Sequence, residues 1–190
     1  MKIIESLQSR RSYYNIEKKI PVTETEVFTL IEQATELVPD AFNMKSSRVV
    51  TVTGKMQDTL WDSIYNAFEG KVAKEKIDSF QKGYGTVLYF YEQEVVKTLQ
   101  EKFPLYADNF PLWASQSSAM LQLTIWSGLR ELGIGASLQH YNPVIDEVVK
   151  KLLNLPASYV LVAQMPFGGI LEEPSPKEKE EIQTRVQFIK

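Results

Sequence analysis

The sequence contains no cysteine and a single histidine, His140. Without cysteine there are no disulfides, no thiol catalysis and no thiolate metal site, and such a chain suits a reducing compartment. One imidazole excludes a zinc or non-haem iron site built on several histidines. A Ser-His-Asp triad would have to run through His140. We therefore expect no metal site and no conventional catalytic triad.

Long apolar runs and an excess of positive charge are also missing. No stretch reaches the 18 or more residues of a membrane helix, and the opening residues lack the apolar core of a signal peptide. The formal net charge is -3, which argues against nucleic acid as the main partner. We expect a cytoplasmic protein with neither nucleic acid nor a membrane as its partner.

The composition is that of an ordinary globular chain. Of 190 residues, 44% are hydrophobic and 24% are charged, which argues against wholesale disorder. A chain of this length can bury one sizeable core. We expect a single domain over residues 1–190.

Hydrophobic periodicity predicts helices and strands that alternate irregularly. Thr23 and Glu26 have the spacing of a capping box, which predicts the start of a helix. The expected helices are 1–7, 23–38, 60–68, 71–83, 113–132 and 143–155, the last with Pro143 in its first turn. The expected strands are 47–54, 85–92 and 158–167, with a short extended piece at 135–139 and a further strand at 185–190. Because a strict βαβ rhythm is missing, we assign the chain to the α+β class.

The helix expected at 113–132 is apolar or small on most faces, which is typical of a helix buried on all sides. Small residues form a stripe along it that would let another backbone approach closely, as in a central or dimer-interface helix. The stripe consists of Ala114, Ser117, Ser118, Leu121 and Gly128.

Arg10, Arg11 and Ser12 follow one another near the start of the chain. Guanidinium groups bind phosphate oxygens bidentately, and a serine adds a hydroxyl donor, so this triplet suits a phosphate. A solvated surface pair is the alternative. The chain has neither a Walker loop nor a G-x-G-x-x-G motif, which argues against ATP hydrolysis and a Rossmann site.

Three further polar clusters are candidates for ligand contacts, although a polar turn or a structural histidine explains them equally well. The first contains Asn43, Lys45, Ser46, Ser47 and Arg48; the second Ser137, Gln139, His140 and Asn142; the third Lys177 and Arg185.

Six short motifs in a fixed order carry a resemblance. They are RRS, FN-x-x-S-x-R before a strand, the apolar helix that begins at Trp113, GASLQHYNP, AQMPFG and a terminal K…RV. In this order the chain resembles the FMN-dependent nitroreductase family, and within it the fatty-acid-repression-like and small bacterial nitroreductases. The resemblance covers nearly the whole length and implies a nitroreductase-like fold, in which helices flank a central mixed or antiparallel sheet. It also implies a homodimer with exchanged terminal segments and two sites, each built from both subunits.

The resemblance assigns cofactor contacts to eleven residues. It implies that Arg10 and Ser12 hold the phosphate or ribityl end of FMN, and that Arg11 lies near the pyrimidine edge of the ring. The other implied contacts are Asn43 and Ser46 at the ring or ribityl chain, Ser137, Leu138 and Gln139 along the ring near N5, and Lys177 and Arg185 at the phosphate. Lys45 stands where glutamine is common in the family, and a cation there would suit a negative flavin.

The implied activity is NAD(P)H-dependent reduction of nitroaromatics or related planar acceptors, with NADH or NADPH as transient hydride donor. Because donor and acceptor would share one space, we expect ping-pong kinetics. The residues leave three alternatives open. These are a flavoenzyme that reduces a quinone or hydroperoxide, a flavin-binding regulatory protein without turnover, and an acidic interaction protein without a cofactor.

The segment 101–113 carries several aromatic residues and two prolines. One interpretation is a covering loop that packs for stability. The other is a wall over the flavin on which flat acceptors stack.

Overall fold

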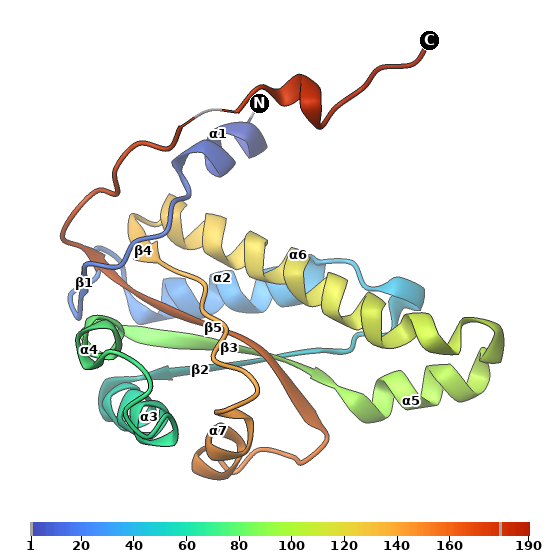
Figure 1. The fold of residues 1–190 in the computed structure, drawn as a ribbon, viewed down its shortest axis with the longest axis horizontal. Helices are drawn as coiled ribbons and strands as arrows, with labels where there is room; N and C mark the ends of the chain where they lie inside the picture. The colour runs from blue at the N-terminus through green and yellow to red at the C-terminus, as the bar shows by residue number, and fades with distance from the viewer. Residues whose placement is uncertain (1, 179) are drawn as a thin grey trace.

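A computed structural model describes residues 2–178 and 180–190 of the chain, arranged around a five-stranded sheet (Figure 1). The strands are β1 (Ile16–Glu17), β2 (Ser47–Thr53), β3 (Gly85–Glu92), β4 (Ile134–Ala136) and β5 (Tyr159–Ile170). Their order is β1-β5-β3-β2, with β4 on β5, and every ladder is antiparallel. The α-helices are α1 (Lys2–Ser9), α2 (Glu24–Leu37), α3 (Gly54–Ala67), α4 (Lys74–Gln81), α5 (Gln93–Lys102), α6 (Phe110–Glu131) and α7 (Asp146–Leu152). Short 3-10 helices are η1 (Ala41–Asn43), η2 (Pro104–Asn109) and η3 (Ile182–Thr184).

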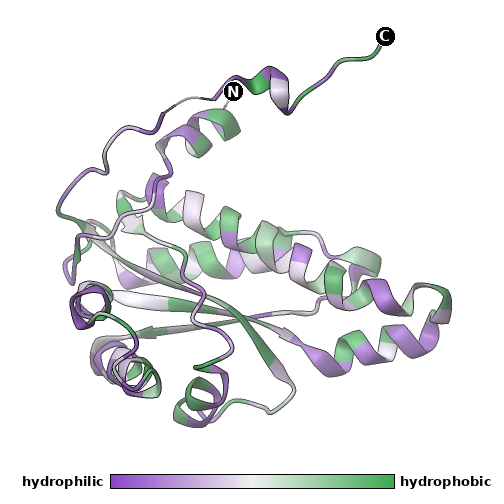
Figure 2. Cartoon of the chain, viewed as in Figure 1, coloured by the Kyte–Doolittle hydropathy of each residue, from purple (hydrophilic) through white to green (hydrophobic). Residues whose placement is uncertain are grey.

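Helices cover both faces of the sheet. α2 and α6 lie on one face, and α3, α4 and α7 lie on the other (Figure 1). Alternate residues of β3 enter the two cores: Val87 and Tyr89 pack against α2 and α6, whereas Leu88 and Phe90 pack against α3 and α7. Because both faces are buried, β3 is a continuous apolar run, and hydrophobic colour follows the sheet in Figure 2.

Local sequence signals explain where several elements begin and end. Thr23 and Glu26 form the capping box at the start of α2: the Glu26 N–H donates to Thr23 Oγ1 at 3.3 Å, and the Thr23 N–H donates to Glu26 Oε2 at 2.8 Å. Gly133, with φ +76°, follows α6 in the left-handed conformation that ends a helix. The predictions for both positions are confirmed.

A third, smaller core lies at one end of α6. There α5 and η2 bring Val96 and Phe103 against Met44, Phe110 and Ala114 (Figure 1). This extension contains α5, which the sequence reading did not predict, because most of its side chains are polar and only Val96 is fully buried.

The α+β class and a central antiparallel sheet flanked by helices are confirmed, and three finer predictions are wrong. Residues 185–190 form no strand; they follow η3 as an irregular segment. α7 begins at Asp146, because Pro143 lies in a turn before it. α6 begins at Phe110 and is not buried on all sides, since Leu112, Met120 and Leu123 are exposed on one face.

The predicted stripe of small residues on α6 faces the same chain. A Cβ on Gly128 would lie 2.5 Å from Leu30 Cδ1 of α2, so a larger residue there would force the Leu30 side chain to move. The Ser117 hydroxyl donates to the Pro39 carbonyl oxygen at 3.0 Å. The stripe therefore serves packing of α6 against α2 and the turn after it.

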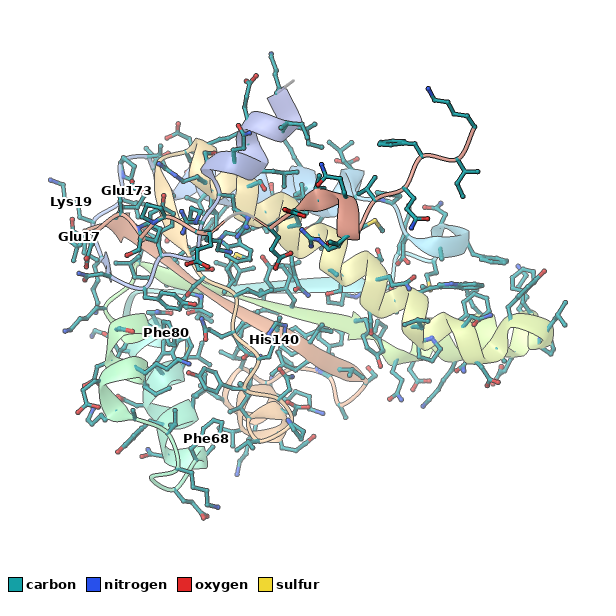
Figure 3. All side chains as sticks on the ribbon, turned by 45° about the horizontal axis from the view of Figure 1, so that its top comes forward. Glu17, Lys19, Phe68, Phe80, His140 and Glu173 are labelled. Carbon is teal, nitrogen blue, oxygen red and sulfur yellow. The ribbon has the colours of Figure 1, made fainter. Side chains whose placement is uncertain are left out.

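The two terminal segments lie side by side at one end of the sheet (Figure 1). The Leu171 N–H donates to the Asn15 carbonyl oxygen at 3.1 Å, and the Tyr13 hydroxyl donates to Glu173 at 2.9 Å. Figure 3 labels Glu173 at this junction. Beyond it the chain leaves the body of the molecule, with Phe188 and Ile189 87% and 93% exposed.

No helix in the described part of the chain is long and apolar enough to cross a membrane.

Candidate functional site

The N-terminal segment runs along the outer edge of β4. Ser12 pairs with Ala136 in a parallel bridge, and the Tyr13 N–H donates to the Ala136 carbonyl oxygen at 3.0 Å. Gly135 permits this approach, because a Cβ there would lie 2.9 Å from Tyr13 Cβ and 2.8 Å from Ile170 Cγ1. The fold thus brings the RRS triplet beside the GASLQ segment.

The Arg10 guanidinium lies over an aromatic ring. Its Cζ lies 4.1 Å from the ring centroid of Trp126, a residue of α6. The Arg10 Nε is buried and has no hydrogen-bond partner in the described chain. Burial and the neighbouring charge of Arg11 lower the pKa of Arg10. An anion beside these two guanidinium groups would satisfy the unpaired donor and relieve their repulsion.

Arg11 and Ser12 line a cavity of about 490 Å³ between the two terminal segments, together with Lys177. The Arg11 guanidinium donates to the Ser175 carbonyl oxygen, but its Nε is buried and, within the residues described, has no partner. The predicted basic pair is divided. Lys177 lies at this cavity, whereas Arg185 follows η3 and forms an ion pair with Glu180 at 3.5 Å.

The segment from Ser137 to Gln139 continues β4 along β5. The Ser137 N–H donates to Pro166 O at 3.2 Å, and the Gln139 N–H donates to Gln164 O at 2.7 Å. Because backbone groups alternate along an extended chain, the N–H of Leu138 points to the opposite edge, where Ser12 lies. The outer edge of β4 therefore brings together predicted contacts that lie far apart in the sequence, Ser12 and Leu138.

A buried amide holds that segment in place. Gln164, fully buried in β5, accepts from the Tyr141 N–H at 2.9 Å and donates to Asn142 Oδ1 at 3.0 Å. The Gln139 side chain donates to Ser137 Oγ at 3.1 Å. These bonds fix the backbone on both sides of Leu138.

The predicted cluster of Asn43, Lys45 and Ser46 folds around Asp40. Asp40 Oδ2 accepts from the Ser46 N–H at 2.8 Å and from the Ser46 hydroxyl at 2.7 Å. Ser46 is also fully buried, and both of its donors already have an acceptor. Three residues between Asp40 and Ser46, namely Phe42, Asn43 and Lys45, have positive φ values of 54°, 49° and 52°. Such a run of left-handed non-glycine residues is strained and persists only where the surroundings enforce it.

Asn43 and Lys45 open onto a different cavity, of about 540 Å³, between α2, α6 and the start of β2. Ser117 of α6 lines that cavity, whereas Trp126 of α6 lies under Arg10. Nine residues of helix separate these two positions, about 14 Å along the axis. One chain therefore presents the predicted contacts as two separate groups, Arg10 to Ser12 with Ser137 to Gln139, and Asn43 with Lys45.

The aromatic segment packs on Phe42. Its ring centroid lies 4.9 Å from that of Phe103, 5.2 Å from that of Phe110 and 5.7 Å from that of Trp113, to which it is stacked. Phe42 and Tyr106 stay partly exposed. The segment is a packed cluster, formed by the end of α5, η2 and the start of α6, that leaves an aromatic surface beside Asn43.

Three residues of this region escaped the sequence reading: Trp126, Asp40 and Gln164. Each acts through a contact distant in sequence or inside a turn, and no short motif announces it. His140, labelled in Figure 3, is exposed.

Comparison with known proteins adds two findings. A family model described as the Nitroreductase family matches residues 7–169. Nitroreductase FRM2 of Saccharomyces cerevisiae is 29% identical over 168 residues, which are 87% of this chain and 86% of that protein.

Solved structures agree in fold. Nitroreductase CinD from Lactococcus lactis, solved in complex with chloramphenicol and with 4-nitrophenol, is 41% identical, with TM-scores of 0.94 and 0.93. The match covers 99% of this chain and 100% of CinD. The nitroreductase from Saccharomyces cerevisiae is 28% identical, with a TM-score of 0.82 over 90% of this chain and 96% of that one.

Proposed function

Since this chain belongs to the nitroreductase family and is an oxidoreductase, we propose that it binds FMN, takes hydride from NADH or NADPH, and reduces nitroaromatics or related planar acceptors. The observation that carries the proposal is the pair of buried, unpaired Nε donors on Arg10 and Arg11 beside the outer edge of β4. A phosphorylated flavin fits this edge.

The donors available there suit the parts of FMN. Arg10, Ser12 and Lys177 would hold the phosphate or ribityl end, because guanidinium, hydroxyl and ammonium groups all donate to phosphate oxygens. The Leu138 N–H, directed to the same edge, would donate to the ring. Bound FMN would supply two-electron hydride chemistry.

The protein's own contribution is positioning and charge. Arg11 would place a positive charge at the pyrimidine edge, where reduction builds negative charge, and Lys45 would add a second cation. The buried Gln164 network keeps Ser137 and Gln139 fixed, so the donor at Leu138 does not reorganise during the reaction. A side-chain acid is not required, since protons come from water.

We propose that a second copy of the chain completes each site. The two groups of predicted contacts lie apart on one chain, and α6 exposes Leu112, Met120 and Leu123 on one face. The extended C-terminal segment offers a means of exchange. Its exposed Phe188 and Ile189 would cross to the partner and lie along β2, whose outer edge is open in the sheet order.

The acceptor proposal rests on the neighbouring structures and on the aromatic surface. CinD was solved with chloramphenicol and 4-nitrophenol, both of which contain a flat nitrophenyl ring. Phe42 and Tyr106 offer partly exposed rings on which such molecules would stack.

The decisive experiment is reconstitution followed by reduction. Purified protein should be yellow or become so with FMN, and NADH or NADPH should bleach it without oxygen. Steady-state assays with nitroaromatics should give parallel double-reciprocal lines, whereas intersecting lines contradict a shared space. Protein that takes up no FMN refutes the proposal. Flavin that no nicotinamide bleaches indicates a binding protein without turnover, and a preference for quinones or hydroperoxides changes the acceptor alone.

The shared site has its own test. Arg10→Gln and Asn43→Ala variants should each weaken FMN binding by tenfold or more, because each damages one half of every site. After unfolding and refolding together, mixed dimers should regain one intact site, since Arg10 and Asn43 of that site come from different chains. A mixture that gains no flavin would contradict the shared site.

A further inference from the structure

The contact between Arg10 and Trp126 has a geometry that suits a binding arginine. The guanidinium carbon lies 4.1 Å from the centroid of the indole ring. A guanidinium held by its face keeps its N–H groups directed outward in its own plane, available to an oxyanion. No hydrogen bond joins the Arg10 side chain to any other residue in the described ranges 2–178 and 180–190.

The indole itself is fixed from several sides. Trp126 Nε1 donates to the Ala136 carbonyl oxygen at 3.0 Å, the same oxygen that accepts from the Tyr13 N–H. One turn further along α6, Arg130 Nε donates to the Ser9 carbonyl oxygen at 3.3 Å, and its Cζ lies 5.4 Å from the Tyr13 ring centroid. Residues four apart share a helix face. This face of α6 therefore holds the N-terminal segment immediately before and after Arg10 and Arg11.

We propose that Trp126 is a positioning residue that presents the Arg10 guanidinium to the phosphate of bound FMN. The inference rests on the proposed function and adds to it a residue that none of the polar motifs contains. A free arginine samples many rotamers and loses this freedom on binding. Trp126 restricts the Arg10 side chain before FMN binds, because its ring attracts the cation and leaves the N–H donors free. Less conformational entropy is then lost on binding.

A role in packing alone does not explain the arrangement. An apolar neighbour would pack against the indole ring equally well, whereas here the half-buried Arg10 guanidinium covers it, and its Nε is buried without a hydrogen-bond partner among the described residues. Arg11, beside it, adds repulsion that a bound dianion would offset. Two guanidinium groups therefore lie side by side, each with a buried Nε that has no hydrogen-bond partner in the described part of the chain.

The test compares FMN with riboflavin, which lacks the phosphate. Both bind with a change in flavin fluorescence, so apo-protein titrations give two dissociation constants for each variant. Trp126→Leu removes the ring and should weaken FMN about tenfold while leaving riboflavin within about twofold. Trp126→Phe keeps a ring face and should retain most of the FMN affinity. Trp126→Met serves in place of the leucine variant if that variant does not fold.

A double-mutant cycle identifies the residue through which Trp126 acts. Arg10→Gln should weaken FMN by tenfold or more, and adding Trp126→Leu to it should cause no further loss. Tyr65→Leu is the matched control. It removes the ring 5.3 Å from Lys74 Nζ on the opposite face of the sheet and should change neither constant.

The outcomes separate the two proposals. Equal weakening of FMN and riboflavin by Trp126→Leu, or a further loss in the Arg10→Gln background, would overturn the positioning role while the flavin function stands. Wild-type protein that binds neither flavin would overturn the proposed function itself.

Discussion

Replacing Asp40 by alanine should loosen the turn that carries Asn43 and Lys45. The carboxylate oxygen Oδ2 accepts from both the N–H and the hydroxyl of Ser46, and Ser46 is fully buried. Without Asp40 two buried donors lose their acceptor, at about 1–3 kcal/mol each. Since the turn relaxes in part, we expect a total loss of about 3 kcal/mol. For a chain of this size that loss lowers Tm by roughly 6–12 °C.

Thermal unfolding followed by circular dichroism measures the loss, and FMN titration measures its effect on the site. Asp40→Asn keeps an oxygen that Ser46 can reach, so it should lose only about 1 kcal/mol. Asp78→Ala is the matched control, because it breaks an exposed ion pair with Lys74 and should cost less than about 1 kcal/mol. An Asp40→Ala protein with the wild-type Tm and FMN affinity would refute the idea that this carboxylate enforces the strained turn.

Three further predictions concern the sheet network and two titrating groups. Gln164→Leu leaves the Tyr141 N–H and Asn142 Oδ1 unpaired and should lower the free energy of unfolding by about 2–4 kcal/mol in urea; an unchanged urea midpoint would contradict the network. Burial raises the pKa of Tyr141 to about 12. The folded protein therefore keeps the phenol neutral at pH values where the unfolded chain ionises it. The contribution of the neutral phenol to the free energy of unfolding is full below the usual pKa of tyrosine and is lost as the pH rises through about 12. Tyr141→Phe removes an unpaired hydroxyl and should flatten unfolding free energy between pH 9 and 12, whereas a steeper decline would count against burial as the cause. Bonds from the Thr23 backbone and side chain lower the pKa of Glu26, so its contribution is present above its usual pKa and is lost as the pH falls through the lowered value. Glu26→Gln should remove that part of the loss of stability in acid. A variant whose free energy of unfolding falls with pH as in wild type would contradict this role of Glu26.

Sequence was a sufficient guide where local chemistry decides the structure. The capping residues Thr23 and Glu26 located α2, the apolar run located β3, and Gly133 located the end of α6. In each case the responsible atoms lie within a few residues of the element they define. Periodicity failed at residues 185–190, because alternating apolar residues make a strand only beside a partner strand, and the single chain provides none there.

The candidate site shows the same division. Neighbouring donors in the RRS triplet are visible in the sequence, and the order of the motifs indicated which segments meet. Trp126 and Gln164 were missed because their partners lie far along the chain: Arg10 is 116 positions before Trp126, and Asn142 is 22 before Gln164. Asp40 was missed for another reason. An aspartate in a turn is common, and only the left-handed backbone of Phe42 and its neighbours shows that Asp40 stabilises a strained turn.

The open edge of β2 also affects the tendency of the protein to aggregate. An unpaired strand edge can pair with an extended segment of another chain. The segment that pairs with it therefore determines whether molecules form a closed dimer or an open-ended aggregate. A variant lacking residues 185–190 would keep the open edge of β2 and lose the segment that we propose to cover it in the partner. Storage of such a truncated chain at high concentration should then yield fibrous or amorphous deposits, where the intact chain remains clear.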